Sequence, residues 1–159
     1  MSAQPGNTTP VIRVMKSCDL DTVALIEARN YEFPWSRGIF NDCLLASYFA
    51  VVLDRGAEIM GYAIISAVAA EGHILNLCID KDWRCMGYGQ QLLDYLMEYA
   101  EDIGIERMFL EVRPSNEAAL HLYDRSGFNR LGVRKGYYRA RNGREDALVF
   151  AKELCLPAD

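Results

Sequence analysis

The feature that most constrains the fold is a glycine-containing turn between an apolar segment and a helical repeat. Residues 73–79 form an apolar run typical of a β-strand. After Arg84, Gly87 and Gly89 the apolar residues recur with helical spacing, at Leu92, Leu93, Leu96, Met97, Ala100 and Ile103. A glycine turn at a helix start leaves backbone N–H groups unpaired at the positive end of the helix dipole. The segment therefore favours an anion-binding site.

Two glycines alone do not distinguish an anion site from an ordinary tight turn. The spacing lacks the third glycine of the dinucleotide fingerprint and the Gly-Lys-Ser/Thr ending of the nucleotide P-loop. The pattern Arg-x-x-Gly-x-Gly at residues 84–89 does resemble the pyrophosphate-binding turn of the GCN5-related N-acetyltransferases. On this motif alone both interpretations stay open.

The length and composition predict one globular domain. A chain of 159 residues, 51% hydrophobic and 25% charged, is long enough to bury roughly 70% of its unfolded surface. We expect residues 1–10, which are polar and contain two prolines, to be a flexible tail before a single domain at 11–159. No run approaches the ~20 apolar residues of a membrane helix, and no leader pattern opens the chain, so we expect a cytoplasmic protein without a membrane partner.

The cysteines and the charge exclude other classes of protein. Five scattered cysteines, Cys18, Cys43, Cys78, Cys85 and Cys155, form no Cys-x-x-Cys pair, and with two histidines we expect neither a disulfide frame nor a metal site. A net charge of −5 argues against a specific nucleic-acid partner. Residues 125–144 nevertheless carry seven basic side chains and no acid. This stretch is either a solvated strand face or a contact for the phosphates of a cofactor or an RNA-bearing partner.

The order of the periodic segments predicts a mixed α/β (α+β) sheet of about seven strands flanked by four helices. We expect strands at 11–15, 48–53, 58–69, 73–79, 105–112, 128–138 and 146–154. We expect helices from Asp19, from Ser36 to about residue 46, from Gly87 to Gly104, and over 116–126. Phe33 and Trp35, in the loop between the first two helices, either staple that corner or line a substrate groove.

A second group of residues carries chemistry near the end of a predicted strand. Alternation places Leu110 and Val112 on one strand face and Glu111 on the other. Glu111 therefore lies where α/β sheets hold their ligands. Asn116 and Tyr123 follow on one helix. Taken singly, each has an ordinary structural explanation: an ion pair for Glu111, a helix cap for Asn116 and core packing for Tyr123.

Together these motifs resemble the bacterial ribosomal-protein-alanine N-acetyltransferases (RimI type) of the GCN5-related superfamily. The resemblance covers residues 11–153, nearly the whole chain. It rests on Phe-Pro-Trp-Ser at 33–36, His-Ile-Leu-Asn at 73–76, Leu-Glu-Val-Arg at 110–113, Ser-Asn at 115–116, Ala-Ala at 118–119, Leu-Tyr at 122–123, Gly-Phe at 127–128, Tyr-Tyr at 137–138 and Gly-Arg-Glu-Asp-Ala-Leu at 143–148. The glycine turn is specific only to the superfamily, and the other pieces narrow the resemblance to this type.

The resemblance implies a fold that binds acetyl-CoA as co-substrate, without a metal, in a notch where the central strand separates from its neighbour. It implies Glu111 as general base for the amine and Tyr123 as general acid for the departing thiolate. The cofactor-binding residues that it implies are Leu77, Cys78, Ile79, Arg84, Cys85, Met86, Gly87, Tyr88, Gly89, Gln90 and Asn116. Cys85 and Met86 stand where relatives often carry basic residues, so we expect weaker cofactor binding.

The acceptor implied by the resemblance is the N-terminal alanine of a small-subunit ribosomal protein. The candidate peptide contacts are Glu32, Phe33, Trp35, Tyr137, Tyr138 and Asp146. Arg139 stands where relatives often have proline, which puts the acceptor in more doubt than the cofactor. The alternatives are a small amine or lysine as acceptor, and a CoA-binding module without catalysis. An acetyl-cysteine route through Cys78 or Cys85 lacks a basic partner in the sequence.

Overall fold

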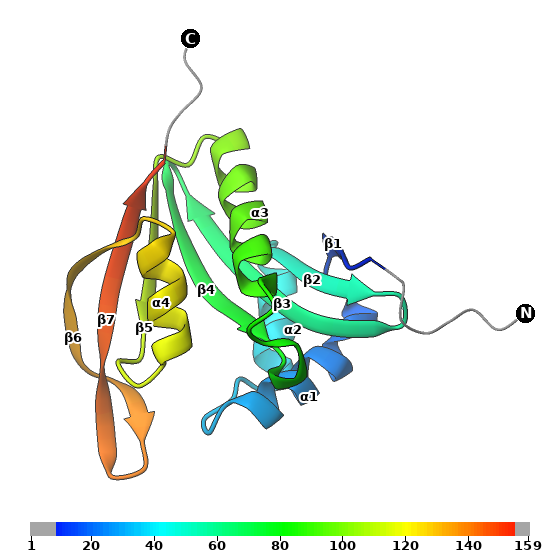
Figure 1. Ribbon diagram of the computed structural model, residues 1–159, viewed down its shortest axis with the longest axis horizontal. Helices are drawn as coiled ribbons and strands as arrows, with labels where there is room; N and C mark the ends of the chain where they lie inside the picture. Colours follow the sequence, from blue (N-terminus) through cyan, green and yellow to red (C-terminus); the bar gives the residue numbers. More distant parts are fainter. Residues whose placement is uncertain (1–8, 155–159) are drawn as a thin grey trace, which may run out of the picture.

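The computed structural model describes residues 9–154, which form one seven-stranded sheet with helices on both faces (Figure 1). The strands are β1 (Val11–Val14), β2 (Phe49–Arg55), β3 (Glu58–Val68), β4 (Glu71–Ile79), β5 (Arg107–Val112), β6 (Asn129–Ala140) and β7 (Gly143–Glu153). The helices are α1 (Leu20–Asn30), α2 (Arg37–Leu45), α3 (Tyr88–Asp102) and α4 (Glu117–Arg125), with short 3₁₀ turns at Ser17–Asp19 and Lys81–Trp83. The predicted fold class is confirmed, while most of the expected tail and Cys155 lie outside the described residues.

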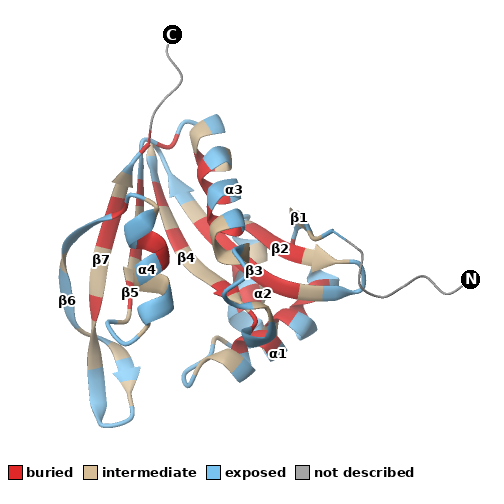
Figure 2. Ribbon diagram, in the orientation of Figure 1, coloured by how far each residue is buried: buried red, intermediate tan, exposed pale blue. Residues whose placement is uncertain are grey.

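The order of strands across the sheet is β1-β2-β3-β4-β5-β7-β6. β4 and β5 pair in parallel, and the other neighbouring strands in the described sheet pair antiparallel. α3 and α4 pack on one face with β4 and β5, and α1 and α2 pack on the other face with β2 and β3. Figure 2 shows buried residues along β2, β3 and β4, whereas most of β6 is exposed. The part of the sheet formed by β2, β3 and β4 is therefore well covered, whereas the edge strand β6 is mostly exposed.

β4 and β5 separate partway along their length. They pair only from Glu71–Ile74 to Arg107–Leu110, although β4 continues to Ile79 and β5 to Val112. The register between β3 and β4 shifts at this point, because Ile65 pairs with Ile74 and Ile64 with Asn76. Leu75 is therefore the extra residue of a β-bulge, and a bulge bends and twists its strand. Figure 1 shows the two strands diverging below their paired ends. The result is a gap between β4 and β5, the notch that the resemblance implies.

Local signals set most element ends as predicted. Ser36 caps α2, since its hydroxyl accepts a hydrogen bond from the N–H of Ile39 at 3.3 Å. Trp35 packs against Phe40 with ring centroids 5.3 Å apart, which is the spacing of a hydrophobic staple. One turn differs. Asn142-Gly143 is a dipeptide typical of a two-residue hairpin loop and predicts the loop at those two positions. The pairing of Ala140 with Gly143 places the loop at residues 141–142 instead.

Among the described residues, each helix is too short or too polar to span a membrane.

Candidate active site

The glycine turn forms the N-terminus of α3 beside the gap. Gly87 is the N-cap with φ of 86°, a left-handed conformation that glycine adopts without strain, and no side chain caps the helix there. The first helical bond runs from the N–H of Gln91 to the carbonyl of Gly87 at 3.1 Å. The helix itself therefore supplies no acceptor for the N–H groups of residues 88–90. Together with the helix dipole, these donors could receive an anion.

Gly89 supports the assignment of this turn to a ligand. A Cβ built on Gly89 would lie 3.6 Å from Leu122 and 3.8 Å from Ile79, which are ordinary contact distances. The protein's own packing therefore does not require glycine at this position. A ligand that approaches the backbone closely would require it. The turn thus fits a pyrophosphate held by backbone groups.

The guanidinium of Arg84 is engaged by the protein itself. Its Nε donates to the carbonyl of Ile79 at 3.0 Å, and its Nη2 donates to Oδ1 of Asn30 in α1 at 2.9 Å. These bonds tie the turn to the end of β4 and to α1. Cys85, at φ of 61°, and Met86 are exposed in the same turn. The backbone of residues 88–90, rather than these three side chains, therefore offers the anion contacts.

The free edge of β4 supplies backbone groups along the gap. The N–H of Asp80 bonds to the carbonyl of Met60 at 2.8 Å, so Asp80 and, by alternation, Cys78 direct their backbone groups to β3. Leu77 and Ile79 direct theirs away from β3, toward the gap. An extended ligand in the gap can therefore pair with this edge as a strand would, which is the arrangement predicted for residues 77–79.

Glu111 lies at the gap on the sheet face that carries α1 and α2. Its side chain is 7% exposed, one carboxylate oxygen contacts Nε2 of His73, and the other lies 3.5 Å from Nη2 of Arg134. Burial raises the pKa of Glu111. The hydrogen bond and charge of His73, and then the charge of Arg134, lower this pKa by more than burial raises it, so the net shift is downward. Glu111 is thus an ionised carboxylate held by two basic side chains.

Tyr123 approaches the gap from the opposite face. It belongs to the core cluster under α3 and α4 and packs edge-on against Phe128, with ring centroids 5.5 Å apart. Burial, with a smaller effect from the charge of Tyr138, raises the pKa of Tyr123, so the hydroxyl stays protonated. Tyr138 also interacts electrostatically with Glu111. Tyr138 is therefore within electrostatic reach of both the Glu111 carboxylate and the Tyr123 phenol.

The α1–α2 loop contacts the β6–β7 hairpin and Arg113, which follows β5. The guanidinium of Arg113 lies 5.6 Å from the ring centroid of Phe33 and 4.4 Å from that of Tyr138. Glu32 and Arg141 join the same two segments by an ion pair at 3.7 Å. Phe33 is 38% exposed. The loop and the hairpin are thus joined through Arg113 and the Glu32–Arg141 ion pair.

Three predicted residues have structural partners instead. Trp35 staples the start of α2, which confirms the first of its two interpretations. The carboxylate of Asp146 accepts from the N–H of Gly136 at 2.8 Å and fixes the hairpin. Asn116 caps α4 by accepting from the N–H of Ala119 at 3.2 Å. Of the other predicted peptide contacts, Glu32 and Phe33 belong to the α1–α2 loop, and Tyr137 and Tyr138 belong to β6.

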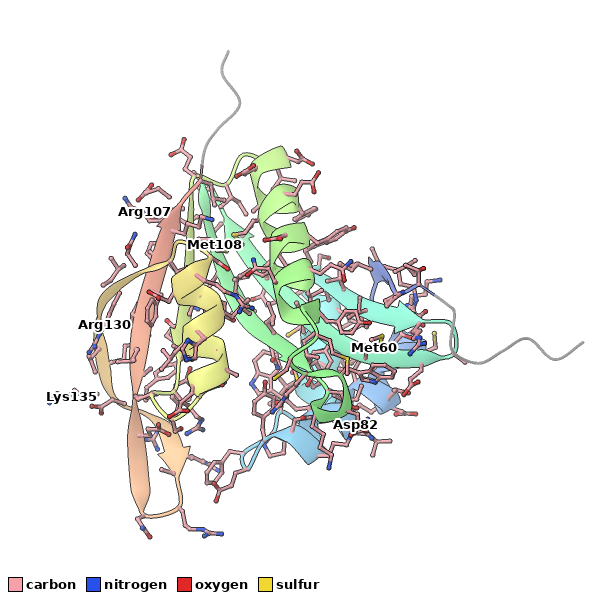
Figure 3. All side chains as sticks on the ribbon, in the orientation of Figure 1. Met60, Asp82, Arg107, Met108, Arg130 and Lys135 are labelled. Atoms are coloured by element: carbon pink, nitrogen blue, oxygen red, sulfur yellow. The ribbon has the colours of Figure 1, made fainter. Side chains whose placement is uncertain are left out.

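The basic stretch divides into engaged and solvent-facing side chains. Arg134 lies beside Glu111, and Arg144 donates to the carbonyls of Gly136 and Tyr137. Arg130 and Lys135 extend from β6 away from the sheet (Figure 3). The stretch is therefore partly a solvated face and partly a lining of the site.

Sequence reasoning missed two residues. Glu27 in α1 is 3% exposed and accepts from the N–H of Trp35 at 2.9 Å, the hydroxyl of Tyr62 at 2.7 Å and the amide of Asn76 at 3.0 Å. It thereby joins the α1–α2 loop to β4 beside the gap. The signal was available, because Glu27 is a charged residue on the apolar face of a predicted helix. The second missed residue is His73, because the sequence motifs indicated a role for its partner Glu111 but not for His73 itself.

Cys78 is buried beneath the gap. Burial raises the pKa of its thiol, although hydrogen bonds with Tyr62 and Tyr31 lower it in part. A thiol held protonated is a poor nucleophile. The geometry therefore disfavours an acetyl-cysteine route through Cys78. Within residues 9–154 no three histidine, cysteine or acidic side chains gather as metal ligands.

Comparison with known proteins identifies the family. Residues 18–128 match the model of the acetyltransferase (GNAT) family. The [ribosomal protein bS18]-alanine N-acetyltransferase of Escherichia coli K12 is 35% identical over 145 residues, which cover 91% of this chain and 98% of that protein. The Haemophilus influenzae enzyme of the same name is 33% identical over 142 residues, which cover 89% of this chain and 97% of that protein.

The fold comparison agrees. The crystal structure of the ribosomal-protein-S18-alanine N-acetyltransferase from Escherichia coli superposes with a TM-score of 0.87 and 32% identity, over 95% of this chain and 97% of that one. The resemblance drawn from the sequence motifs is confirmed. The protein belongs to the acetyltransferase (GNAT) family, whose acetyl donor is acetyl-CoA.

Proposed function

We propose that this protein acetylates the N-terminal α-amine of a protein, and that its acceptor is the N-terminal alanine of a small-subunit ribosomal protein. The observation that carries the proposal is the placement of Glu111 and Tyr123 on opposite faces of the sheet at the β4–β5 gap, beside the contacts between the α1–α2 loop and the β6–β7 hairpin. The names of the relatives support the acceptor. Residues 11–159 are then one catalytic domain, and the cytoplasm, where ribosomal proteins are made, is its compartment.

Backbone groups are proposed to hold the acetyl donor. The β4 edge at Leu77 and Ile79 would pair with the extended arm, and the N–H groups of Tyr88, Gly89 and Gln90 would receive the pyrophosphate. The space over Gly89 supports this arrangement. Bound acetyl-CoA supplies an acetyl group already activated as a thioester.

The proton movements are assigned to side chains on the two faces. Glu111 removes a proton from the acceptor amine at the gap, and its ionised state suits this role. Tyr123 holds a proton on its buried hydroxyl and delivers it on the other face, where the leaving group departs. No acyl-enzyme is needed, in keeping with the buried and protonated thiol of Cys78.

The strength of the base bears on the acceptor. A peptide α-amine has a pKa near ~8, against ~10.4 for lysine. Exposing the neutral α-amine at neutral pH therefore costs roughly 3 kcal/mol less, at ~1.36 kcal/mol per pKa unit. A single carboxylate whose pKa is lowered can serve an α-amine far more readily than a lysine. This argument favours an N-terminal acceptor over a side-chain one.

The test is an acetyl-transfer assay with two peptides. One begins Ala-Arg with a free N-terminus and has no lysine, and the other has the same sequence with a blocked N-terminus and one internal lysine. With labelled acetyl-CoA we expect label on the free N-terminus alone. Label on the lysine peptide, or on a polyamine offered in parallel, would overturn the acceptor. Acetyl-CoA binding without transfer to any of them would instead favour a binding module.

A further inference from the structure

His73 lies one pair before the end of the β4–β5 pairing. It pairs with Phe109 of β5, and Ile74 with Leu110 forms the final rung. Ile74 and Leu110 lie in the core under α3 and α4, so alternation turns His73 and Glu111 to the other face. There Nε2 of His73 contacts Oε2 of Glu111. The base at the gap is therefore one member of a pair.

The two members differ in their access to water. The side chain of Glu111 is 7% exposed, whereas that of His73 is 34% exposed. A proton taken up by Glu111 cannot leave easily through such a small exposed surface. The imidazole offers an outward path, because it can accept a proton on one ring nitrogen and release one from the other.

The other titratable groups around Glu111 cannot replace His73. Arg134, from β6, lies 3.5 Å away and stays protonated. Burial raises the pKa of Tyr138, also from β6, so it too keeps its proton. From β3, the residue paired with His73 is Ser66, which does not titrate. An imidazole is the side chain whose ordinary pKa lies nearest neutral pH. Among these neighbours of Glu111, the imidazole of His73 is the group that can accept a proton on one ring nitrogen and release one from the other.

We propose that His73 and Glu111 act as one proton-accepting pair, in which His73 receives the proton that Glu111 removes from the acceptor amine and passes it to solvent. The amine N–H bond breaks as a Glu111 O–H bond forms. That proton then moves from Oε2 to the unprotonated Nε2 of His73, and the imidazolium releases the proton on Nδ1 to water. Proton exchange with water then returns the imidazole to its Nδ1–H tautomer. The carboxylate returns to its ionised state for the next turnover. The inference rests on the proposed role of Glu111, and it needs no particular acceptor.

The test compares two substitutions at one position. His73→Gln keeps an N–H donor toward Glu111 but cannot carry a proton outward, whereas His73→Ala removes both. We expect kcat to fall about 10- to 100-fold in both variants, with the KM for acetyl-CoA within about twofold of wild type. Imidazole added to His73→Ala should restore part of the lost kcat in proportion to its neutral form. His121→Gln, at the described chain's other histidine, exposed on α4, is the matched control and should leave kcat unchanged.

The pH profile separates a proton relay from a merely structural contact. The dependence of kcat on pH should differ between wild type and His73→Gln, because glutamine cannot take over a proton from Glu111. Wild-type kcat and an unchanged profile in His73→Gln would overturn the proposal. Full activity in His73→Gln with a loss in His73→Ala would also overturn it, because the histidine would then only position Glu111. If wild type acetylates lysine instead of an α-amine, the proposed acceptor fails, and the same comparison is made with the lysine peptide.

Discussion

The two sides of the β4–β5 gap are built in different ways. On the donor side the useful groups are backbone N–H and C=O groups of Leu77 and Ile79 and backbone N–H groups of residues 88–90. On the acceptor side they are side chains from separate segments, with Arg113 between Phe33 and Tyr138 and Glu32 paired to Arg141. A backbone site is fixed by the local fold. A side-chain site depends on which residues stand at several distant positions.

This difference explains how the chain tolerates its departures from its relatives. Cys85 and Met86 replace basic residues in the donor turn, but the helix N-terminus is unchanged by their side chains. Arg139 replaces a proline in the hairpin and meets Arg113 through its backbone carbonyl at 2.7 Å. A proline would keep that carbonyl. Such changes should affect the choice of acceptor more than the choice of donor.

The largest effect is expected at the chemical centre, on which both sides converge. Glu111→Gln preserves the shape but removes the base, so kcat should fall about 100- to 1,000-fold. The acetyl-CoA dissociation constant should stay within about twofold of wild type, because the donor side uses other groups. Steady-state kinetics and calorimetry measure the two quantities. A variant with near-normal kcat would remove Glu111 from the mechanism.

Substitution at Gly89 should separate stability from donor binding. In Gly89→Ala the new Cβ meets only ordinary contacts, and alanine is favoured over glycine in a helix by about 1 kcal/mol. The melting temperature should rise, while the Cβ crowds the backbone cradle and weakens acetyl-CoA binding about 10-fold, or ~1.4 kcal/mol. Gly132→Ala, also in open space but on β6, is the control and should leave binding unchanged. Unchanged affinity in Gly89→Ala would contradict the backbone account.

Glu27 should affect the acceptor side more than the donor side. A glutamine there cannot accept from all three donors, so Glu27→Gln should cost about 1–3 kcal/mol of stability. Because the carboxylate fixes the loop through the N–H of Trp35, the peptide KM should rise several-fold, on the order of 10-fold. Glu98→Gln, on the exposed face of α3, is the control. An equal rise in both KM values would mean that Glu27 supports the whole sheet rather than the loop.

The smallest effect should come from adding charge to the donor turn. Met86 is 61% exposed, so Met86→Arg brings a cation near the proposed pyrophosphate at high dielectric. We expect the KM for acetyl-CoA to fall about two- to threefold at low ionic strength and to return toward wild type as salt is added. A fall in the KM for acetyl-CoA beyond about 10-fold, or one that salt does not reduce, would contradict the account in which backbone groups rather than side chains hold the donor.

The sequence predicted the local parts of this arrangement well. The glycine turn, the staple at Trp35 and the alternation that isolates Glu111 each depend on residues close together in the chain. Such signals can be read from spacing and from helix and strand periodicity. The mixed sheet of seven strands and the four helices followed from the order of these elements along the chain, whereas the order of the strands across the sheet was not predicted.

The sequence could not predict contacts between distant segments. Glu27 and Asn76 are 49 positions apart, and His73 and Glu111 are 38 apart. The gap begins at the β-bulge at Leu75, and no residue type in this segment predicts a bulge. The side chains of Asp146 and Asn116 hold the hairpin and the start of α4, contacts that were not predicted for Asp146. Each of these depends on pairing that appears only in the folded chain.

The most direct measurement of the central claim uses a whole acceptor. A purified small-subunit ribosomal protein with alanine at its mature N-terminus is incubated with acetyl-CoA and either wild-type enzyme or Glu111→Gln, and the product is mapped by tandem mass spectrometry. The account predicts one acetyl group on the α-amine with wild type and nearly none with the variant over the same time. Acetylation of lysines, or equal modification by both proteins, would contradict it.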